Sequence, residues 1–371
     1  MPKGKKKTAK PLDKWLKKNK LWAGLAALAI ILIAVSAYFL MQPEKPKLQA
    51  VSVPQDTCRQ TNQTTFSCYK HLLQRTTTNQ GPESAVALLR ASYDQVPYVK
   101  SQCHQLMHIV GRQAFLQYND DLGATFSHGD QFCWSGYYHG ALEELSKQRG
   151  TEIVSEANSV CADLRNSNVS SFDHFNCVHG LGHGFMYILG QDLMKSLKAC
   201  DTLTDSFERT SCYGGVFMQN IMNVQTPDRE AGYASPYLKE SDPMYPCTAL
   251  DDRYKEQCYL MQTSYALQVE NYDFNKVFAL CAAIEKTYRP TCYTSVGRDA
   301  SGQSVSDVER TKNTCLLGKD HEAQSYCING AAKDFVSYYH DDTKARQLCD
   351  SLPDNLKADC QQVVTSYYAG F

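Results

Sequence analysis

The sequence lacks the short motifs that mark the common enzyme classes. It contains no CxxC, HExxH or GxSxG pattern and no glycine-rich phosphate loop. Each of these patterns supplies a particular arrangement of nucleophile, metal ligand or phosphate-binding backbone. Without them, the thioredoxin-like, zinc-protease, serine-hydrolase and nucleotide-binding classes have no support.

Basic residues are scarce outside the N-terminus. The chain has 38 basic and 39 acidic residues, but residues 1–41 hold nine of the lysines and only one acidic residue, Asp13. The remaining 29 basic and 38 acidic residues give the rest of the chain a net charge of −9. An acidic body of this kind argues against nucleic acid as a partner, because nucleic-acid binding depends on neutralising phosphates.

One long uncharged run predicts a membrane segment. Residues 21–41 carry no charge, and a helix of that length at about 1.5 Å per residue crosses a hydrocarbon core of about 30 Å. Because all nine lysines precede the run, we expect a basic cytoplasmic tail at 1–20, a signal-anchor helix in the lipid bilayer at 21–41, and the main domain outside the cytoplasm. Three prolines predict an extended linker at 42–57. A cleaved signal peptide is the alternative, although its apolar region is usually shorter.

Sixteen cysteines form the main pattern of the chain. An even number in an exported protein predicts disulfides, and places the main domain at a cell surface, in a periplasm or in a secretory lumen. The cysteines pair at short spacing, and the last four pairs recur every 33 to 35 residues. A repeat of this length indicates helical hairpins that bury their apolar faces on one another. The expected pairs are Cys58 with Cys68, Cys161 with Cys177, Cys200 with Cys212, Cys247 with Cys258, Cys281 with Cys292, Cys315 with Cys327, and Cys349 with Cys360.

Cys103 and Cys133 are left without a partner in this register. Each occupies the second-cysteine position of its unit, so they either bridge to each other between units or stay free. The predicted fold is all-α: a disulfide-stapled helical-hairpin repeat array, like an α/α solenoid, after one N-terminal transmembrane helix. We expect histidine-bearing helical repeats at 58–222, an insertion loop rich in proline and tyrosine at 223–246, and cysteine-paired helical repeats at 247–371.

Five histidines follow the second cysteines of three consecutive units, and none occupies that place in the later units. A four-residue step places two side chains on one helical face, and neighbouring helices of a repeat array bring equivalent positions side by side. Imidazole and carboxylate together suit transition metals, with zinc, copper or iron as candidates. The sequence therefore predicts a site for one or two metal ions with the ligands His104, His108, His139, Glu143, His179 and His183.

The register of the first unit leaves an alternative open. His104 and His108 lie one and five residues after Cys103, whereas His139 and His183 each lie six residues after their own cysteine. On a helix this difference is a rotation of about 100°. Either the first helix is rotated, or the inner set consists only of His139, Glu143, His179 and His183.

Glycines crowd around the histidines and allow two interpretations. They either open room for a ligand or let the helices pack closely. His128 and His174 fall in the segments just before the histidine-bearing helices. We expect them in solvated loops, from which either can act as an outer ligand.

Two classes of function remain open, and the sequence does not decide whether the protein is an enzyme. In the first, the metal site serves metal-dependent catalysis on a small molecule or metal capture, and Glu143 or Glu144 is a ligand or a general base acting on metal-bound water. In the second, the histidines are structural and the repeat face binds a protein or peptide partner. A metal-free histidine and carboxylate site is a third, less favoured hypothesis.

Overall fold

The computed structural model describes residue 58 and the ranges 65–93, 95–165, 172–225, 235–304, 307–339 and 341–369. These ranges are all-helical and contain no strand. None of the helices in them is long and apolar enough to span a membrane. The predicted tail at 1–20, signal-anchor helix at 21–41 and linker at 42–57 lie outside the described residues.

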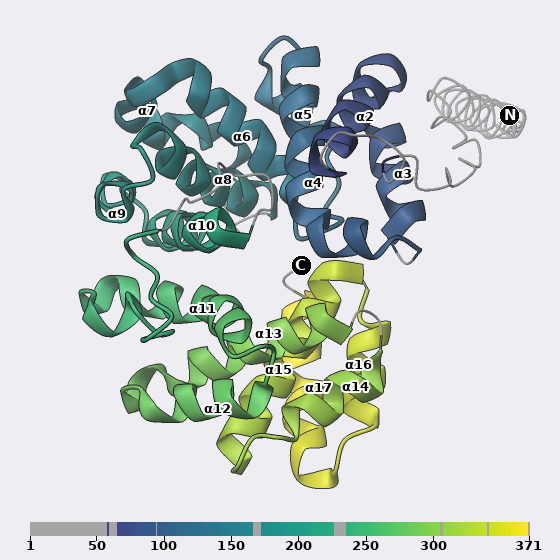
Figure 1. Cartoon of the computed structure of the whole chain (residues 1–371), viewed down its shortest axis with the longest axis vertical. Coiled ribbons are helices and arrows are strands. Elements are labelled where there is room, and N and C mark those ends of the chain that lie inside the picture. Colours follow the sequence, from purple (N-terminus) through teal and green to yellow (C-terminus); the bar gives the residue numbers. More distant parts are fainter. Residues whose placement is uncertain are drawn as a thin grey trace, which may run out of the picture. The chain divides into compact units, whose positions relative to one another are not determined.

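Within the described ranges, nine long helices form a row in which each one packs against the next (Figure 1). They are α2 (Thr65–Gln80), α4 (Pro97–Gln117), α6 (Gly136–Arg149), α8 (Phe172–Ile188), α10 (Ser206–Gln225), α11 (Asp252–Val269), α13 (Arg289–Ser304), α15 (His321–Tyr339) and α17 (Asp354–Ala369). α10 extends to Gln225, so it includes the first residues of the predicted insertion at 223–246.

Shorter helices connect the long ones and complete the hairpins. They are α3 (Pro82–Tyr93), α5 (Leu122–Ser127), α7 (Ile153–Val160), α9 (Leu193–Cys200), α12 (Phe274–Ala283), α14 (Val308–Cys315) and α16 (Thr343–Asp350). A single 3₁₀ turn at Cys247–Ala249 takes this place before α11. The prediction of helical repeats is confirmed.

Several short helices begin with the same device. An aspartate at the N-cap accepts a hydrogen bond from a backbone N–H in the first turn, which satisfies a donor that has no partner inside the helix. In three cases two residues with positive φ precede this aspartate, so the chain reverses direction in one step. The capping residues are Asp121 of α5, Asp192 of α9, Asp273 of α12 and Asp307 of α14.

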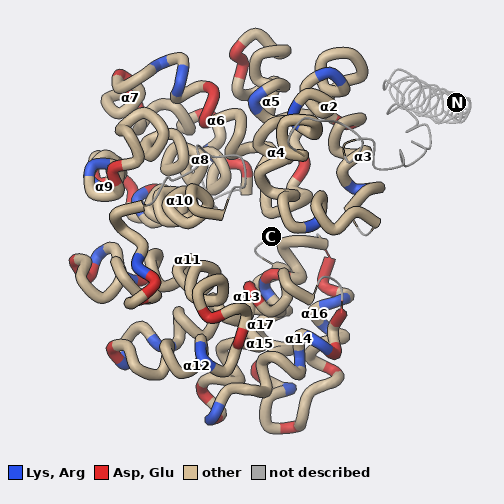
Figure 2. The backbone as a smooth tube through the Cα atoms, viewed as in Figure 1, with Lys and Arg blue, Asp and Glu red and all other residues tan. Residues whose placement is uncertain are grey.

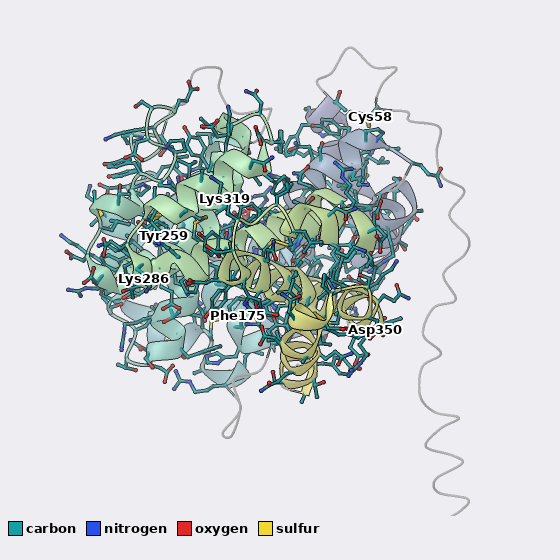
Figure 3. All side chains as sticks on the ribbon, turned by 90° about the horizontal axis from the view of Figure 1, so that it is seen from below. Cys58, Phe175, Tyr259, Lys286, Lys319 and Asp350 are labelled. Carbon is teal, nitrogen blue, oxygen red and sulfur yellow. A yellow bond between two sulfur atoms is a disulfide. The ribbon has the colours of Figure 1, made fainter. Side chains whose placement is uncertain are left out.

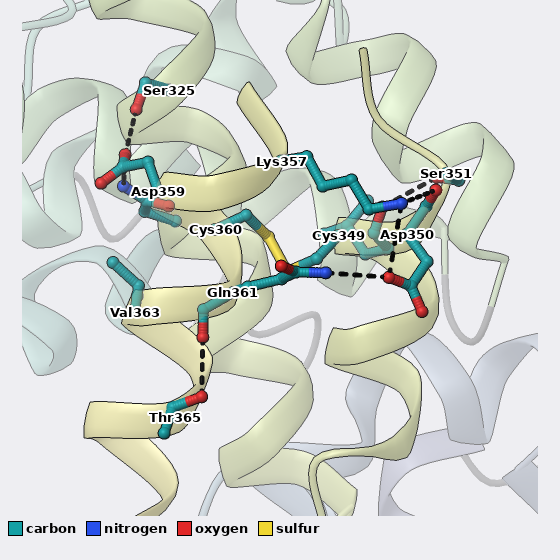
Figure 4. The surroundings of a disulfide bond; sticks show 12 residues. Ser325, Cys349, Asp350, Ser351, Lys357, Asp359, Cys360, Gln361, Val363 and Thr365 are labelled. Carbon is teal, nitrogen blue, oxygen red and sulfur yellow. Dashed lines mark hydrogen bonds and ion pairs between the residues drawn. A yellow bond between two sulfur atoms is a disulfide. The ribbon is translucent and has the colours of Figure 1, made fainter. Parts of the chain in front are cut away.

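All sixteen cysteines are paired in eight disulfides, and the seven pairs expected from the repeat are confirmed. Cys103 and Cys133 bridge to each other and join α4 to the residues just before α6. Figure 4 shows a typical hairpin, in which the disulfide of Cys349 and Cys360 links α16 to α17 and Gln361 donates to the Asp350 carboxylate at 3.0 Å. Eight disulfides indicate an oxidising compartment outside the cytoplasm.

Charged side chains lie mainly away from the packed interior. Figure 2 shows few of them along α8 and α10, which supply much of the core. Tyr259 is 1% exposed, whereas Lys286 and Asp350 are exposed (Figure 3).

The array curves back so that an early repeat contacts a late one. The indole nitrogen of Trp134 donates to the Asp334 carboxylate at 3.1 Å, across 200 residues of sequence. The ring of Tyr338 lies against those of Tyr93, Phe132 and Trp134, with centroids 5.7 to 6.3 Å apart. Tyr93 and Trp134 also line a pocket between the two halves of the array.

Candidate metal centre

Five histidine side chains from three neighbouring helices meet in the interior. α4 supplies His104 and His108, α6 supplies His139, and α8 supplies His179 and His183. Ring centroids lie 4.7 Å apart for His139 and His179, 4.8 Å for His139 and His183, and 5.3 Å for His104 and His139. His104 is half-buried and the other four are buried. The structure thus brings together all five imidazoles that the sequence singled out.

Glycines determine how closely these helices approach. A Cβ added to Gly140 of α6 would lie 2.1 Å from the His108 carbonyl oxygen, and one added to Gly215 of α10 would lie 1.9 Å from the His179 carbonyl oxygen. The pair α13 and α15 uses the same device with no histidine at the contact, since a Cβ on Gly297 would meet the Cys327 carbonyl oxygen at 1.8 Å. Close helix packing therefore explains the glycines, and this packing is what brings the imidazoles together.

The register difference between α4 and α6 has a local cause. Cys133, Trp134 and Ser135 all have positive φ, so Cys133 lies outside α6, whereas Cys103 lies within α4. Counting from the cysteine therefore misplaces the two helices relative to each other. His104 and His108 join the other three histidines, as in the first of the two alternatives.

Three of the histidines have an outer hydrogen-bond partner that fixes the ring. His104 Nδ1 donates to the Cys133 carbonyl at 2.8 Å. His183 Nδ1 lies 2.7 Å from Gln219 Oε1, and Gln219 is itself held by Asn223. Such partners are typical of metal-ligating histidines, because they set the tautomer and orient the free nitrogen.

The third partner is Glu143. One carboxylate oxygen lies 3.0 Å from His108 Nδ1, and the other accepts from Arg112 at 2.6 Å. Burial alone would raise the pKa of the Glu143 carboxyl, but His108 and Arg112 outweigh it and hold that pKa well below its usual range. Glu143 is thus an ionised acceptor, and the His108 ring directs an N–H at it.

These outer partners leave two ring nitrogens facing each other. Since His104 and His108 each use Nδ1 for an outer partner, their Nε2 atoms face each other, 3.0 Å apart. Either a proton, which makes this contact a hydrogen bond, or a metal ion lies between them. Two nitrogens on one tetrahedral zinc ion lie about 3.3 Å apart, given a Zn–N distance of about 2.0–2.1 Å.

Five further nitrogens in the cluster have no hydrogen-bond partner among the described residues. They are both ring nitrogens of His139, both of His179, and Nε2 of His183. The backbone of Ser211 lies near His179, outside hydrogen-bond geometry. Buried polar atoms are rarely left unpaired, and each such exception calls for an explanation such as an ion.

Possible ligand atoms within 4.8 Å of one another form three groups that share members. The first is His104, His108 and His139, the second is His139, His179 and His183, and the third is His108, Glu143 and His183. Buried histidine clusters of this kind can hold a metal ion.

Burial is the main cause of low pKa values in the cluster. It lowers the pKa of His104 and of His183 from 6.5 to about 3, with electrostatic repulsion from the neighbouring His108 imidazole as the second cause. Burial and the neighbouring imidazoles also hold the pKa of His139 and His179 well below its usual range. These four rings are neutral at pH 7 and offer lone pairs.

The metal-free protein is expected to lose stability as the pH falls below about 6.5. The unfolded chain takes up protons on these histidines near 6.5, whereas the folded protein takes them up at His104 and His183 only near 3, so protons favour the unfolded state. Each such group lowers the free energy of unfolding by about 1.4 kcal/mol per pH unit in this window and has no effect above it. Urea midpoints at about pH 7.5, 6 and 5 measure this slope.

The pH range between about 6.5 and 5 reports on these histidines and not on Glu143. Glu143 loses its stabilising charge only when the pH falls below 4.5. His128→Ala is the control, and it should leave the slope unchanged. A flat profile between about pH 6.5 and 5 would contradict the low histidine pKa values.

The other predicted residues lie elsewhere. Glu144 belongs to none of the three groups found in the described part of the chain, and it pairs with Lys147 on the same helix. His128 is a loop residue that pairs with Glu83 at 2.5 Å. The prediction for His174 is wrong: it lies inside α8, is 2% exposed and binds Glu208 at 2.9 Å, because α8 begins earlier than the linking segment suggested.

Sequence reasoning missed the outer partners and the cavity. Arg112 continues the four-residue step of His104 and His108 along α4, so that spacing was a usable signal. Gln219 lies on α10, which contributes no histidine to the cluster, so no four-residue spacing pointed to it. A cavity of about 620 Å³ has His104 and Trp134 in its wall together with residues of α10, α11 and α13.

Comparison with known protein families, with characterised proteins and with solved structures finds no match for this chain. No relative supplies a ligand set, a metal or a reaction. The site is therefore interpreted from its own geometry.

Proposed function

We propose that this protein is a membrane-anchored metalloprotein that binds one or two transition-metal ions in the histidine cluster, outside the cytoplasm. Zinc, copper and iron are the candidate ions, because imidazole suits all three. The eight disulfides support the compartment. The uncharged run at 21–41 supports the single-pass anchor, with the N-terminus in the cytoplasm.

The proposal rests on the five buried ring nitrogens that lack a partner within the described ranges. If the histidines only packed, each such nitrogen would cost about 1–3 kcal/mol. Bound metal satisfies four of them when both nitrogens of His139, one of His179 and Nε2 of His183 are ligands. It is also one of the two ways to satisfy the facing Nε2 atoms of His104 and His108. The hypothesis of a scaffold for a protein or peptide partner explains the repeats but leaves these atoms unexplained.

The cavity favours a metal site that acts on a small molecule over a closed site that only stores metal. His104 lies in the wall of a space of about 620 Å³, which is within the usual range for ligand pockets. A metal ion held by His104 would therefore be accessible from this cavity. An accessible ion with a free coordination position is the arrangement of catalytic rather than structural sites.

Elemental analysis of the purified full chain, exported so that the disulfides form, tests the proposal. We expect one or two equivalents of metal, with less metal bound in His139→Ala and in His183→Ala while helix content by circular dichroism is kept. His128→Ala is the matched control and should retain the metal. No metal in the native protein, and none taken up from zinc, copper or ferrous iron, would favour the scaffold hypothesis.

Glu143→Gln is expected to weaken metal binding about 10- to 100-fold, the usual effect of removing an outer partner of a ligating histidine. The amide oxygen can still accept the Nδ1 proton of His108, but it carries no negative charge, so it makes the His108 ring a weaker metal ligand and no longer pairs with Arg112. Competition with a chromophoric chelator measures the affinity.

Glu144→Gln is the control for this experiment, because the neighbouring carboxylate is equally buried but pairs with Lys147. It should bind metal as the native protein does. Equal loss in both variants would mean that Glu143 has no special link to the metal.

A further inference from the structure

His139 lies between two pairs of histidines. On one side its ring meets His104 and His108 edge-on, with centroids 5.3 and 5.7 Å away. On the other side it stacks on His179 and His183 at 4.7 and 4.8 Å. It is the one histidine shared by the two all-histidine groups found in the described residues.

Both ring nitrogens of His139 are buried and lack a hydrogen-bond partner among the described residues. This separates it from His104, His108 and His183, each of which uses Nδ1 for an outer partner. A single metal ion would occupy only one nitrogen of His139 and leave the other unpaired in the interior. Two ions, one on each nitrogen, satisfy both.

The number of available lone pairs fits two ions. His104, His108 and His183 each keep Nε2 free of an outer partner, and the His183 ring lies 4.8 Å from His139 and 5.4 Å from His108 between centroids. With one nitrogen of His179 and the two of His139, each ion receives three protein ligands. Three protein ligands with a fourth position open is the arrangement of catalytic zinc sites.

We infer that the cluster is a two-metal centre in which the His139 imidazolate bridges the ions. This rests on the proposed function and specifies it. The first ion is held by His104, His108 and His139, and the second by His139, His179 and His183. Binding of the second ion displaces the remaining ring proton of His139 to solvent, so the bridge carries one negative charge.

The two ions have different surroundings, which assigns them different roles. His104 is half-buried and lies in the cavity wall, so the first ion is the one that a small molecule in the cavity reaches. His179 and His183 are 3% and 0% exposed, so the second ion is enclosed. It holds α6 against α8 and polarises the shared imidazolate.

Metal stoichiometry after zinc loading and gel filtration of the full chain is the first test. We expect two ions in the native protein, and one in each of His104→Ala and His179→Ala, because each exchange removes a ligand of one ion only. His179→Gln, with a polar side chain, serves if His179→Ala fails to fold. His128→Ala should keep both ions.

Copper loading followed by electron paramagnetic resonance is the second test. Two cupric ions on one imidazolate couple, so the native protein should show much less signal than its copper content predicts. His139→Ala removes the bridge, and any copper that stays bound should then give full intensity. His104→Ala should give the full signal of one isolated ion.

The outcomes distinguish the two proposals. One ion in the native protein, or a copper signal that equals the copper content at two ions, would overturn the bridged centre and leave the metalloprotein standing. Loss of both ions in His104→Ala or in His179→Ala would also overturn the bridged centre. No metal at all would overturn both.

Discussion

Gly140→Ala is expected to destabilise the protein by about 3 kcal/mol or more and to abolish metal binding. The new Cβ would lie 2.1 Å from the carbonyl oxygen of His108. The obstacle is backbone, so no side chain can rotate away, and α4 and α6 must separate. Because His104 and His108 lie on one helix and His139 on the other, the separation also opens the metal centre. Urea denaturation and metal analysis measure the two effects.

Gly297→Ala separates these effects, because it creates the same clash between α13 and α15, where the Cβ would lie 1.8 Å from the Cys327 carbonyl oxygen. It should lower stability by a similar amount and leave the metal content of the folded protein unchanged. Gly123→Ala, at an exposed position of α5, meets only the Asp121 side chain, at 3.4 Å, and should be neutral or slightly stabilising. Native-like stability of Gly140→Ala would show that the helices can move apart freely.

Removal of the disulfide between Cys103 and Cys133 by a double exchange to serine is expected to cost about 3–4 kcal/mol on the chain-entropy estimate for its loop of 30 residues. The metal centre should suffer as well. The Cys133 carbonyl accepts the Nδ1 proton of His104, and the three left-handed residues from Cys133 to Ser135 depend on this crosslink for their position. Thermal unfolding and retained metal are the measurements.

Serine in place of Cys349 and Cys360 provides the comparison. This disulfide closes a loop of 11 residues in the last hairpin, so its removal should cost about 2–3 kcal/mol. Metal binding should persist, since the hairpin contributes no histidine to the cluster. If the two double variants lose metal equally, the link between Cys133 and His104 has no functional role.

Sequence reasoning reached the repeat and the five histidines because both are periodic. Cysteines at a fixed spacing indicate a helical hairpin, and histidines four residues apart indicate one face of a helix. The Cys133 to Ser135 turn breaks the register without any glycine or proline to signal it, so the place of His104 and His108 stayed ambiguous. His174 was placed before the helix although the sequence carries a start signal, with Ser171 directly before Phe172 and Asp173 in the first turn of α8.

Other features depend on contacts between residues distant in sequence. Gln219 meets His183 only because α10 packs against α8. Trp134 and Asp334 meet across 200 residues through the accumulated rotation of the repeats. No local pattern carries such information, so the cavity and the outer partners were not predicted. The membrane anchor at 21–41 stays a prediction.

The contact between early and late repeats changes how such an array should unfold. In an open solenoid each repeat touches only its neighbours, so the ends can fray independently of the middle. Here contacts of Trp134 with Asp334 and Tyr338 join the first half of the array to the last. Unfolding of the last repeats would therefore expose aromatic side chains in both halves. The repeats should therefore unfold as one cooperative unit, with amide exchange in α15 as slow as in α6. Deleting the C-terminal repeats would then loosen the wall of the cavity that His104 faces.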